Sequence, residues 1–410
     1  MIDINVGNAQ EKVFRDLLLR AHDLKTRVQL CDLSGNHKKD LSPMFLDGQV
    51  TVDATAEVTR ALDISFIDPL GKIDIEPDSP SKSSIFIADL MKVWVVMRDP
   101  TTDKVYQVPV FTGPIDAVTR TDMFLDVKCV GKERLALDNV WSGKVFKKGQ
   151  KKTDVIRWIL VNMVGETALD IPDRAAKLSR DLKVSHDDVP WKVASQLAGS
   201  MNLLLLYDGR GIARLRARSS KPSLILTEKW VSDYPQVAFD LTEGVYNAVR
   251  VIGGKPKKAK TKITWTEVAS KTDSLSPWRL GRNGVPRFIT YLVEDDSIRT
   301  LAEAKSLAKD LLDSGLKSGV SFTVDGIMDP RLEEYDVVRA AVGDVSVQSS
   351  IKSFTIPLTA GDDGSYGYVR RINPKGGARI IKRHRNKHRR HRHHAHAAAS
   401  TVNADGKKSA

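Results

Sequence analysis

The stretch Arg60-Ala61-Leu62-Asp63-Ile64-Ser65-Phe66-Ile67-Asp68 carries the clearest structural pattern in this chain. Leu62, Ile64 and Phe66 are spaced two residues apart, so they share one face of an extended backbone. The stretch therefore predicts a half-buried strand, and the turn residues Pro69-Leu70-Gly71 end it.

Similar strand patterns surround this stretch at short spacing. One is 122–130, in which Met123, Leu125, Val127 and Cys129 share a face. Several short strands separated by turns are typical of a sandwich or barrel. Ahead of them, apolar residues at helical spacing predict an N-terminal helix within residues 1–27. We therefore expect a first β-barrel-like domain at residues 28–140.

The next part of the chain mixes helical and strand patterns. Thr153 is expected to cap a helix that stops at Gly165, and Asp188 to cap a second helix near Pro190. The apolar run Leu203–Tyr207 predicts a strand, and a tight turn at Asp208-Gly209-Arg210-Gly211 leads to its partner. These patterns predict an α/β domain at residues 141–235.

Strand patterns return after this unit. We expect a second β-barrel-like domain at residues 236–370, with an inserted helix near 297–313, and a basic tail at 371–410. The predicted fold class is mainly β with an α/β insertion: two β-barrel-like domains flank an α/β domain, and a disordered tail follows.

The order of these elements resembles the baseplate hub and tail-associated proteins of tailed bacteriophages, a family related to the hub part of type VI secretion spike proteins. Four stretches carry the resemblance: 60–68, 189–211 with its Val-Pro-Trp and Asp-Gly-Arg-Gly segments, Gly244–Val251, and Pro330–Val338 followed by Ile356-Pro357-Leu358. Tyr335 departs from the family pattern, in which a small turn residue is expected before Asp336.

The resemblance implies a homotrimer in which two similar β-domains per chain form a ring at the tail tip of the virion. It implies contacts with a distal tail ring protein, a tape-measure protein and other tail-tip proteins. The lumen of such a ring lets the tape-measure protein and DNA pass, so the implied function is structural, without a cofactor or a metal.

Catalytic and metal-binding interpretations find little support in the residues. Before the tail the chain has three histidines, His22, His37 and His186, and none has zinc-ligand spacing. We interpret Asp187-Asp188 beside His186 as acidic residues at a helix start. We interpret Glu294-Asp295-Asp296 and Glu333-Glu334 as solvated surface, because neighbours on an extended chain point to opposite faces. We therefore expect no enzyme, and a tail-associated peptidoglycan hydrolase is the catalytic alternative.

The net charge of +13 lies mostly at the C-terminus, since residues 379–410 contain ten Lys or Arg and one Asp. We expect this tail to be disordered and to bind a polyanion such as DNA or an acidic protein partner, or to act only as a solubilising tail. An alternative function is therefore a tail protein that binds nucleic acid through its basic C-terminus. The residues expected to bind are Arg379, Lys382, Arg383, Arg385, Lys387, Arg389, Arg390 and Arg392.

The rest of the composition is that of an ordinary globular protein, with 41% hydrophobic and 28% charged residues. No run of about 20 apolar residues predicts a membrane span, and we expect no signal peptide. Cys31 and Cys129 lie in strand patterns, so we expect two buried, reduced thiols of a protein made in a cytoplasm.

Overall fold

A computed structural model of the chain describes most of residues 1–367 and a short segment near the C-terminus. The described residues are 1–3, 8–20, 23–75, 84–86, 89–138, 143–219, 221–232, 236–239, 245–256, 261–295, 298, 300–316, 320–343, 345–351, 353–360, 364–367 and 379–380.

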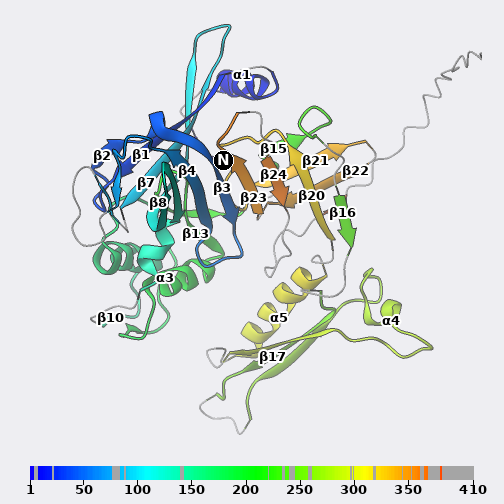
Figure 1. Ribbon diagram of the computed structural model, residues 1–410. Helices are drawn as coiled ribbons and strands as arrows, with labels where there is room; N and C mark the ends of the chain where they lie inside the picture. The colour runs from blue at the N-terminus through cyan, green and yellow to red at the C-terminus, as the bar shows by residue number, and fades with distance from the viewer. Residues whose placement is uncertain are drawn as a thin grey trace, which may run out of the picture.

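A sheet of 11 strands is the centre of the fold, and both predicted β-blocks contribute to it (Figure 1). Its strand order is β16-β20-β24-β23-β3-β4-β9-β8-β7-β1-β2. The first block supplies β1 (Asp23–Cys31), β2 (His37–Asp40), β3 (Phe45–Asp53), β4 (Arg60–Ile67), β7 (Leu90–Arg98), β8 (Val105–Thr121) and β9 (Phe124–Val130). The second block supplies β16 (Gln236–Phe239), β20 (Val320–Gly326), β23 (Ser353–Pro357) and β24 (Gly364–Gly367).

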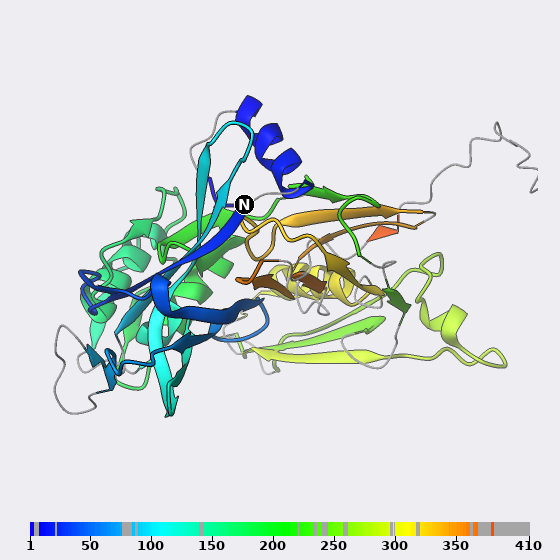
Figure 2. The ribbon, with the colours of Figure 1, turned by 45° about the horizontal axis from the view of Figure 1, so that its top comes forward.

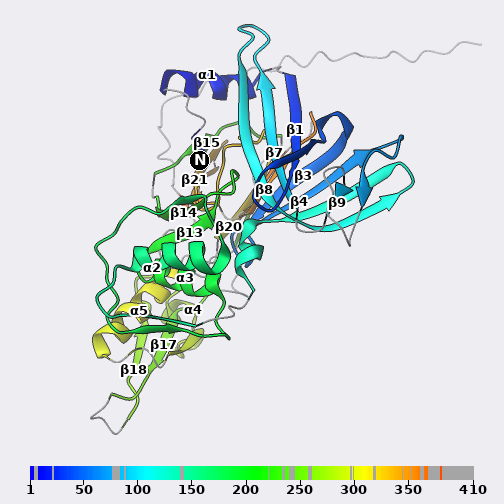
Figure 3. The ribbon, with the colours of Figure 1, turned by 90° about the vertical axis from the view of Figure 1, so that its left-hand side faces the viewer.

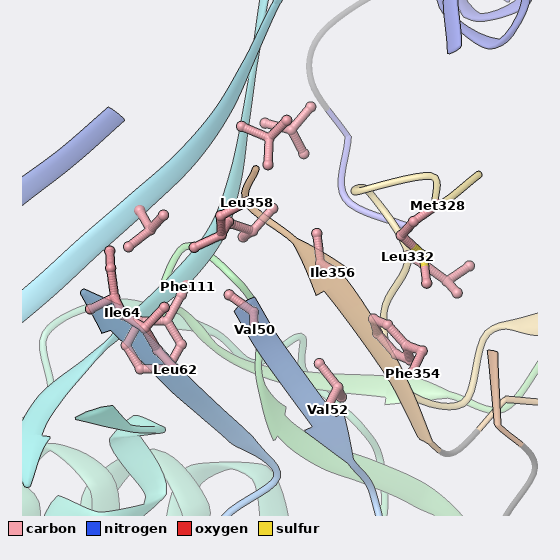
Figure 4. Close-up of a cluster of buried hydrophobic side chains, with 14 of the residues drawn as sticks. Val50, Val52, Leu62, Ile64, Phe111, Met328, Leu332, Phe354, Ile356 and Leu358 are labelled. Carbon is pink, nitrogen blue, oxygen red and sulfur yellow. The ribbon is translucent and has the colours of Figure 1, made fainter. Parts of the chain in front are cut away.

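The two blocks meet where β3 pairs with β23, with Thr51 opposite Thr355. On the inner face of these strands, Val50, Leu62 and Ile356 belong to one apolar core (Figure 4). The alternation predicted for the opening stretch is confirmed, because Leu62, Ile64 and Phe66 are all buried. The same holds for Leu125, Val127 and Cys129 of β9.

The expectation of barrel-like domains is wrong for the described strands. The long sheet has two open edges, β2 and β16, and none of the smaller described sheets closes either. The reason lies in the β3–β23 pairing, because the two blocks extend one another in a single open sheet. The prediction that the chain is mainly β is confirmed.

The α/β unit lies beside this sheet (Figure 2) and has an apolar cluster of its own. Gly165 ends its first helical segment with a positive φ of 79°, as predicted. Both capping predictions are wrong: Lys151 precedes α2 and Val189 precedes α3, each without a side-chain cap. The elements are β10 (Lys144–Phe146), α2 (Lys152–Ile159), the π-helical turn Leu160–Val164, β11 (Leu169–Asp170), β12 (Leu182–Val184), α3 (Pro190–Gly199), β13 (Leu203–Tyr207) and β14 (Ala213–Ala217).

Two smaller units follow, and the domain boundaries drawn from the sequence stay predictions. The first block also contains the short parallel pair β5 (Asp74–Ile75) and β6 (Ser84–Ile85). A three-stranded sheet packs on α5 and carries its own apolar cluster. It contains β17 (Ala248–Gly253), β18 (Thr264–Val268) and β19 (Thr290–Asp295), with α4 (Pro277–Leu280) and α5 (Leu301–Gly315). A four-stranded sheet contains β15 (Leu224–Leu226), β21 (Val337–Val342), β22 (Val345–Ser350) and β25 (Arg379–Ile380), and α1 (Asn8–Leu18) lies near the N-terminus.

Candidate functional site

The polar face of the long sheet is the first candidate site, and it runs across both β-blocks. Because strand side chains alternate, the face opposite the apolar core carries the remaining residues of β3, β4, β9 and β23. Asp63, Gln49 and Pro357 follow one another across three adjacent strands. The face is hollowed into a groove of about 730 Å³.

Carboxylates and hydroxyls dominate this groove. Asp126 accepts a hydrogen bond of 2.5 Å from the Ser65 hydroxyl, and Asp47 accepts one of 2.6 Å from Thr359. Asp47, Asp63 and Asp126 form no ion pair with another described residue, and Lys128 is the one cation among the lining residues. An acidic, hydroxyl-rich surface of this kind repels polyanions and gives them nothing to bind.

The second candidate site is a buried cluster of charges behind the sheet, which we call the joint. Arg60 begins β4 with only 3% of its surface exposed, and its Nη2 lies 2.8 Å from Glu333 and 2.9 Å from Glu334. The surface interpretation of Glu333-Glu334 is therefore wrong, because both side chains are fully buried. The signal was present in the sequence: Arg60 has the same parity as Leu62, so it faces the core and needs counter-ions.

The pKa values in the joint follow from burial. Burial raises the pKa of Glu133 to about 7 and that of Glu333 to about 7, although Arg60 opposes the second shift. One oxygen of each, Oε2, is buried without a hydrogen-bond partner among the described residues. Burial opposes the charge on Arg60, but Glu333 and Glu334 raise its pKa overall.

Three of the four stretches that carry the sequence resemblance meet at this joint. The turn Asp208-Gly209-Arg210-Gly211 lies against β8, where the Thr112 hydroxyl donates to the Gly209 carbonyl over 3.2 Å. A Cβ on Gly209 would approach the Pro109 carbonyl oxygen to 2.6 Å, which explains the glycine. Tyr335, the departure from the family pattern, has a φ of 63°, the left-handed region that a small turn residue would adopt more easily.

The fourth stretch has a separate task in the small β17–β19 unit. Asn247 is fully buried, and its Nδ2 donates to the carbonyls of Leu275 over 3.1 Å and Arg287 over 3.0 Å. Its Oδ1 accepts from the Ile289 amide over 2.8 Å. Asn247 thus fixes both ends of the segment between β18 and β19.

Of the basic tail, the structure describes only residues 379–380. The backbone of Arg379 pairs with Gln348 in the short strand β25. Lys382, Arg383, Arg385, Lys387, Arg389, Arg390 and Arg392 lie outside the described residues.

The described residues named for the catalytic and metal alternatives do not come together in a catalytic or metal-binding arrangement. His186 and Asp187 are exposed, and Asp188 accepts hydrogen bonds from the amide and hydroxyl of Ser185. Glu294 is exposed, whereas the side chain of Asp295 and residue Asp296 lie outside the described part. Within that part, no three His, Cys, Asp or Glu residues gather in a way that would hold a metal ion.

The two cysteines are buried, as predicted. Cys31 and Cys129 are buried free thiols, and burial raises the pKa of Cys129. No described helix is long and apolar enough to cross a membrane.

Comparison with known proteins finds similarity in structure only. No protein-family model matches the sequence, and no curated protein matches it. The 43 kDa tail protein of prophage MuSo2 from Shewanella oneidensis superposes with a TM-score of 0.58 at 14% identity, covering 85% of this chain and 98% of that one.

Two further tail proteins superpose almost as well. The tail protein of Neisseria meningitidis MC58 gives a TM-score of 0.55 at 11% identity, covering 85% of this chain and 96% of that one. The prophage tail protein gp18 of Listeria monocytogenes gives 0.53 at 9% identity, with 85% and 95% covered. The resemblance recognised in the sequence is thereby confirmed for the fold: this chain has the fold of phage tail proteins.

Proposed function

We propose that the chain is a structural protein of a phage tail tip, a baseplate hub subunit that assembles as a ring. The fold match to tail proteins supports a tail role, because it covers most of this chain and nearly the whole of each tail protein. The sequence resemblance supports a homotrimer. Each of the three chains then contributes its two β-blocks, which gives six similar segments in one ring.

The observation that carries the proposal is the polar face that continues across β9, β4, β3 and β23. A ring through which tape-measure protein and DNA pass needs a lining that does not hold them. Polyphosphate binds proteins through Lys and Arg, which replace its counter-ions. This face offers carboxylates and hydroxyls with a single lysine, so it suits the wall of such a passage.

Antibody decoration of intact phage particles tests the tail-tip assignment. The proposal predicts label at one end of the tail in negative-stain images. Particles that contain no copy of this chain, or that carry label on the capsid alone, would contradict it.

The proposed role is structural and not enzymatic. A zymogram with host cell wall checks this directly, and we expect no clearing by the purified full chain. Clearing would favour the alternative of a tail-associated peptidoglycan hydrolase.

A second candidate function concerns the basic tail. The tail follows β25, the edge strand of the four-stranded sheet, and we propose that it reaches a polyanion from there. DNA binding by the chain with and without residues 379–410 tests this at several salt concentrations. Loss of affinity and a shallower salt dependence on truncation would support DNA binding, and equal affinity would exclude it.

A further inference from the structure

The segment between β18 and β19, residues 270–289, projects from the small unit, and we call it the arm (Figure 1). It exposes large apolar side chains: Trp278 is 46% exposed, Val285 67% and Phe288 50%. Trp278 and Phe288 lie edge to face with ring centroids 6.4 Å apart. Exposed apolar groups that gather in this way mark an interaction surface.

The arm is held in one conformation despite this exposure. The buried Asn247 fixes both of its ends, and the Arg287 amide donates to the Pro277 carbonyl over 2.9 Å. At its far end Asn283 and Gly284 have φ values of 52° and 78°, as in a type I′ turn. A surface ordered in advance loses less entropy when a partner binds.

The arm is also basic, and its guanidinium groups pair with no carboxylate among the described residues. Lys271, Arg279, Arg282 and Arg287 outnumber the single Asp273. The three arginines are exposed and form no ion pair with a described residue. Tryptophan and arginine together are the residues that contribute most to protein interfaces.

A surface of matching chemistry lies at the turn between β8 and β9, which we call the tip. Phe124 pairs with Ile67, and the Asp68 amide donates to the Met123 carbonyl. The segment 66–70 at the end of β4 therefore lies beside the segment 122–126 at the start of β9. The tip exposes the apolar side chain of Met123 and, facing the arm in our proposal, three further apolar side chains and three carboxylates that form no ion pair with a described residue. These are Leu46, Leu70 and Phe124, and Asp47, Asp122 and Asp126.

The arm does not reach the tip of its own chain. Figure 3 shows the β8–β9 turn and the α4 region on different sides of the molecule. A contact between them is therefore heterologous, from one copy to the next, and such contacts build closed rings when the rotation allows. Asp47 and Asp126 belong to both the groove and the tip. The contact therefore covers only that end of the groove, and the part of the polar face around Asp63 stays uncovered.

We propose that the arm of one chain docks on the tip of a second copy, with Arg279, Arg282 and Arg287 opposite Asp47, Asp122 and Asp126. Trp278, Val285 and Phe288 then cover Leu46, Leu70 and Phe124. The inference rests on the proposed ring and names the contact that builds it.

Charge reversal in the full chain tests the contact. One variant carries Arg279→Glu, Arg282→Glu and Arg287→Glu, and a second carries Asp122→Arg and Asp126→Arg. Sedimentation velocity over a concentration series is expected to show self-association weakened by about tenfold or more in each, because like charges then face one another. A chain with all five substitutions is expected to regain most of the association, since two of the three facing pairs are then opposite in charge again.

A matched control changes the net charge equally at another place. Arg174, Lys177 and Arg180 are exposed on the α/β unit, and their replacement by Glu is expected to leave self-association unchanged. The inference would be overturned if the arm variant self-associated as strongly as this control, or if the variant with all five substitutions stayed dissociated.

Disulfide trapping tests the same contact where association is weak. Val285→Cys with Phe124→Cys is expected to give covalent dimers and larger species on oxidation, whereas the native Cys31 and Cys129 are buried. Val285→Cys with Leu33→Cys is the control, because Leu33 is 55% exposed but lies at the β1–β2 turn. Trapping no greater than the control overturns the arm contact, while antibody label at the tail tip would still support the proposed function.

Discussion

At the scale of single residues, Arg60 is the cation that holds the joint together. It is a buried cation at the start of a core strand, and it holds two fully buried carboxylates from a loop about 270 positions later, Glu333 and Glu334. Its Nη1 also donates to the Val110 carbonyl over 3.0 Å. One guanidinium therefore connects β4, β8 and the 329–336 loop.

Replacing Arg60 with Met is expected to lower the free energy of unfolding by about 3–5 kcal/mol, because two buried carboxylates lose their cation. Arg98→Met is the matched control, since the Arg98–Asp103 pair is exposed at 54% and 74% and contributes about 1 kcal/mol or less. Urea unfolding measures both. Equal losses in the two variants would mean that the joint is not held by charge.

The carboxyls of the joint make stability depend on pH in a definite direction. Burial raises the pKa of Glu133 from 4.5 to about 7, so between these values the folded chain keeps a proton that the unfolded chain has lost. The free energy of unfolding therefore falls as pH rises from about 4.5 to about 7 and is then level. Glu333 acts in the same direction.

Glu133→Gln removes one of the two carboxyl groups that take up a proton on folding. The amide oxygen of the new glutamine still accepts the hydrogen bond from the Thr59 hydroxyl. We expect the variant to be more stable than the parent above pH 7 and to lose less stability between pH 5 and 7. Thermal unfolding over a pH series measures this. A variant whose pH dependence matches the parent's would show that Glu133 does not titrate in this range.

At the scale of elements, two short segments hold other parts of the chain in place. The Asp208–Gly211 turn seats the α/β unit on β8, and Asn247 fixes the arm within the β17–β19 unit. Both segments belong to the stretches that carried the sequence resemblance. The turn acts through close backbone contact at Gly209, and Asn247 acts through side-chain hydrogen bonds to the backbone.

Gly209→Ala is expected to cost about 1–3 kcal/mol, because the new methyl group collides with the Pro109 carbonyl at the seat of the turn. Gly199→Ala is the control: nothing lies within 4 Å of its Cβ position, and alanine in α3 is neutral or stabilising by up to about 1 kcal/mol. Denaturant midpoints compare the two. A neutral Gly209→Ala would contradict the close contact.

Asn247→Ala is expected to release the arm, since three hydrogen bonds at its two ends are lost together. Limited trypsin digestion then cleaves faster after Arg279, Arg282 and Arg287. Asn162→Ala, which removes one exposed hydrogen bond to Trp158, is the control and should leave the cleavage rate unchanged. Equal cleavage of both variants would show that the arm is ordered without Asn247.

The sequence was informative about local structure and less so about how the segments meet. Alternation in the opening stretch predicted β4 and its buried face, because period and burial are local properties. Glu333-Glu334 was misjudged, because what buries it is Arg60, far away in the chain. The open sheet was missed for the same reason: the β3–β23 pairing joins residues 300 positions apart.

At the scale of the whole molecule, the long sheet gives the chain two unlike surfaces. One side carries the apolar core shared by both blocks, and the other carries the acidic groove. The arm and the tip lie on different parts of the same chain, so the proposed contact joins copies head to tail. In the proposed ring the polar face is the inner wall.

A map of the assembled phage tail, at a resolution that separates strands, tests this most directly. The proposed ring predicts three copies around the tail axis, with Asp63, Lys128 and Thr355 of the polar face directed toward the passage. A ring in which this face is directed away from the axis, or is covered by another protein, would contradict it.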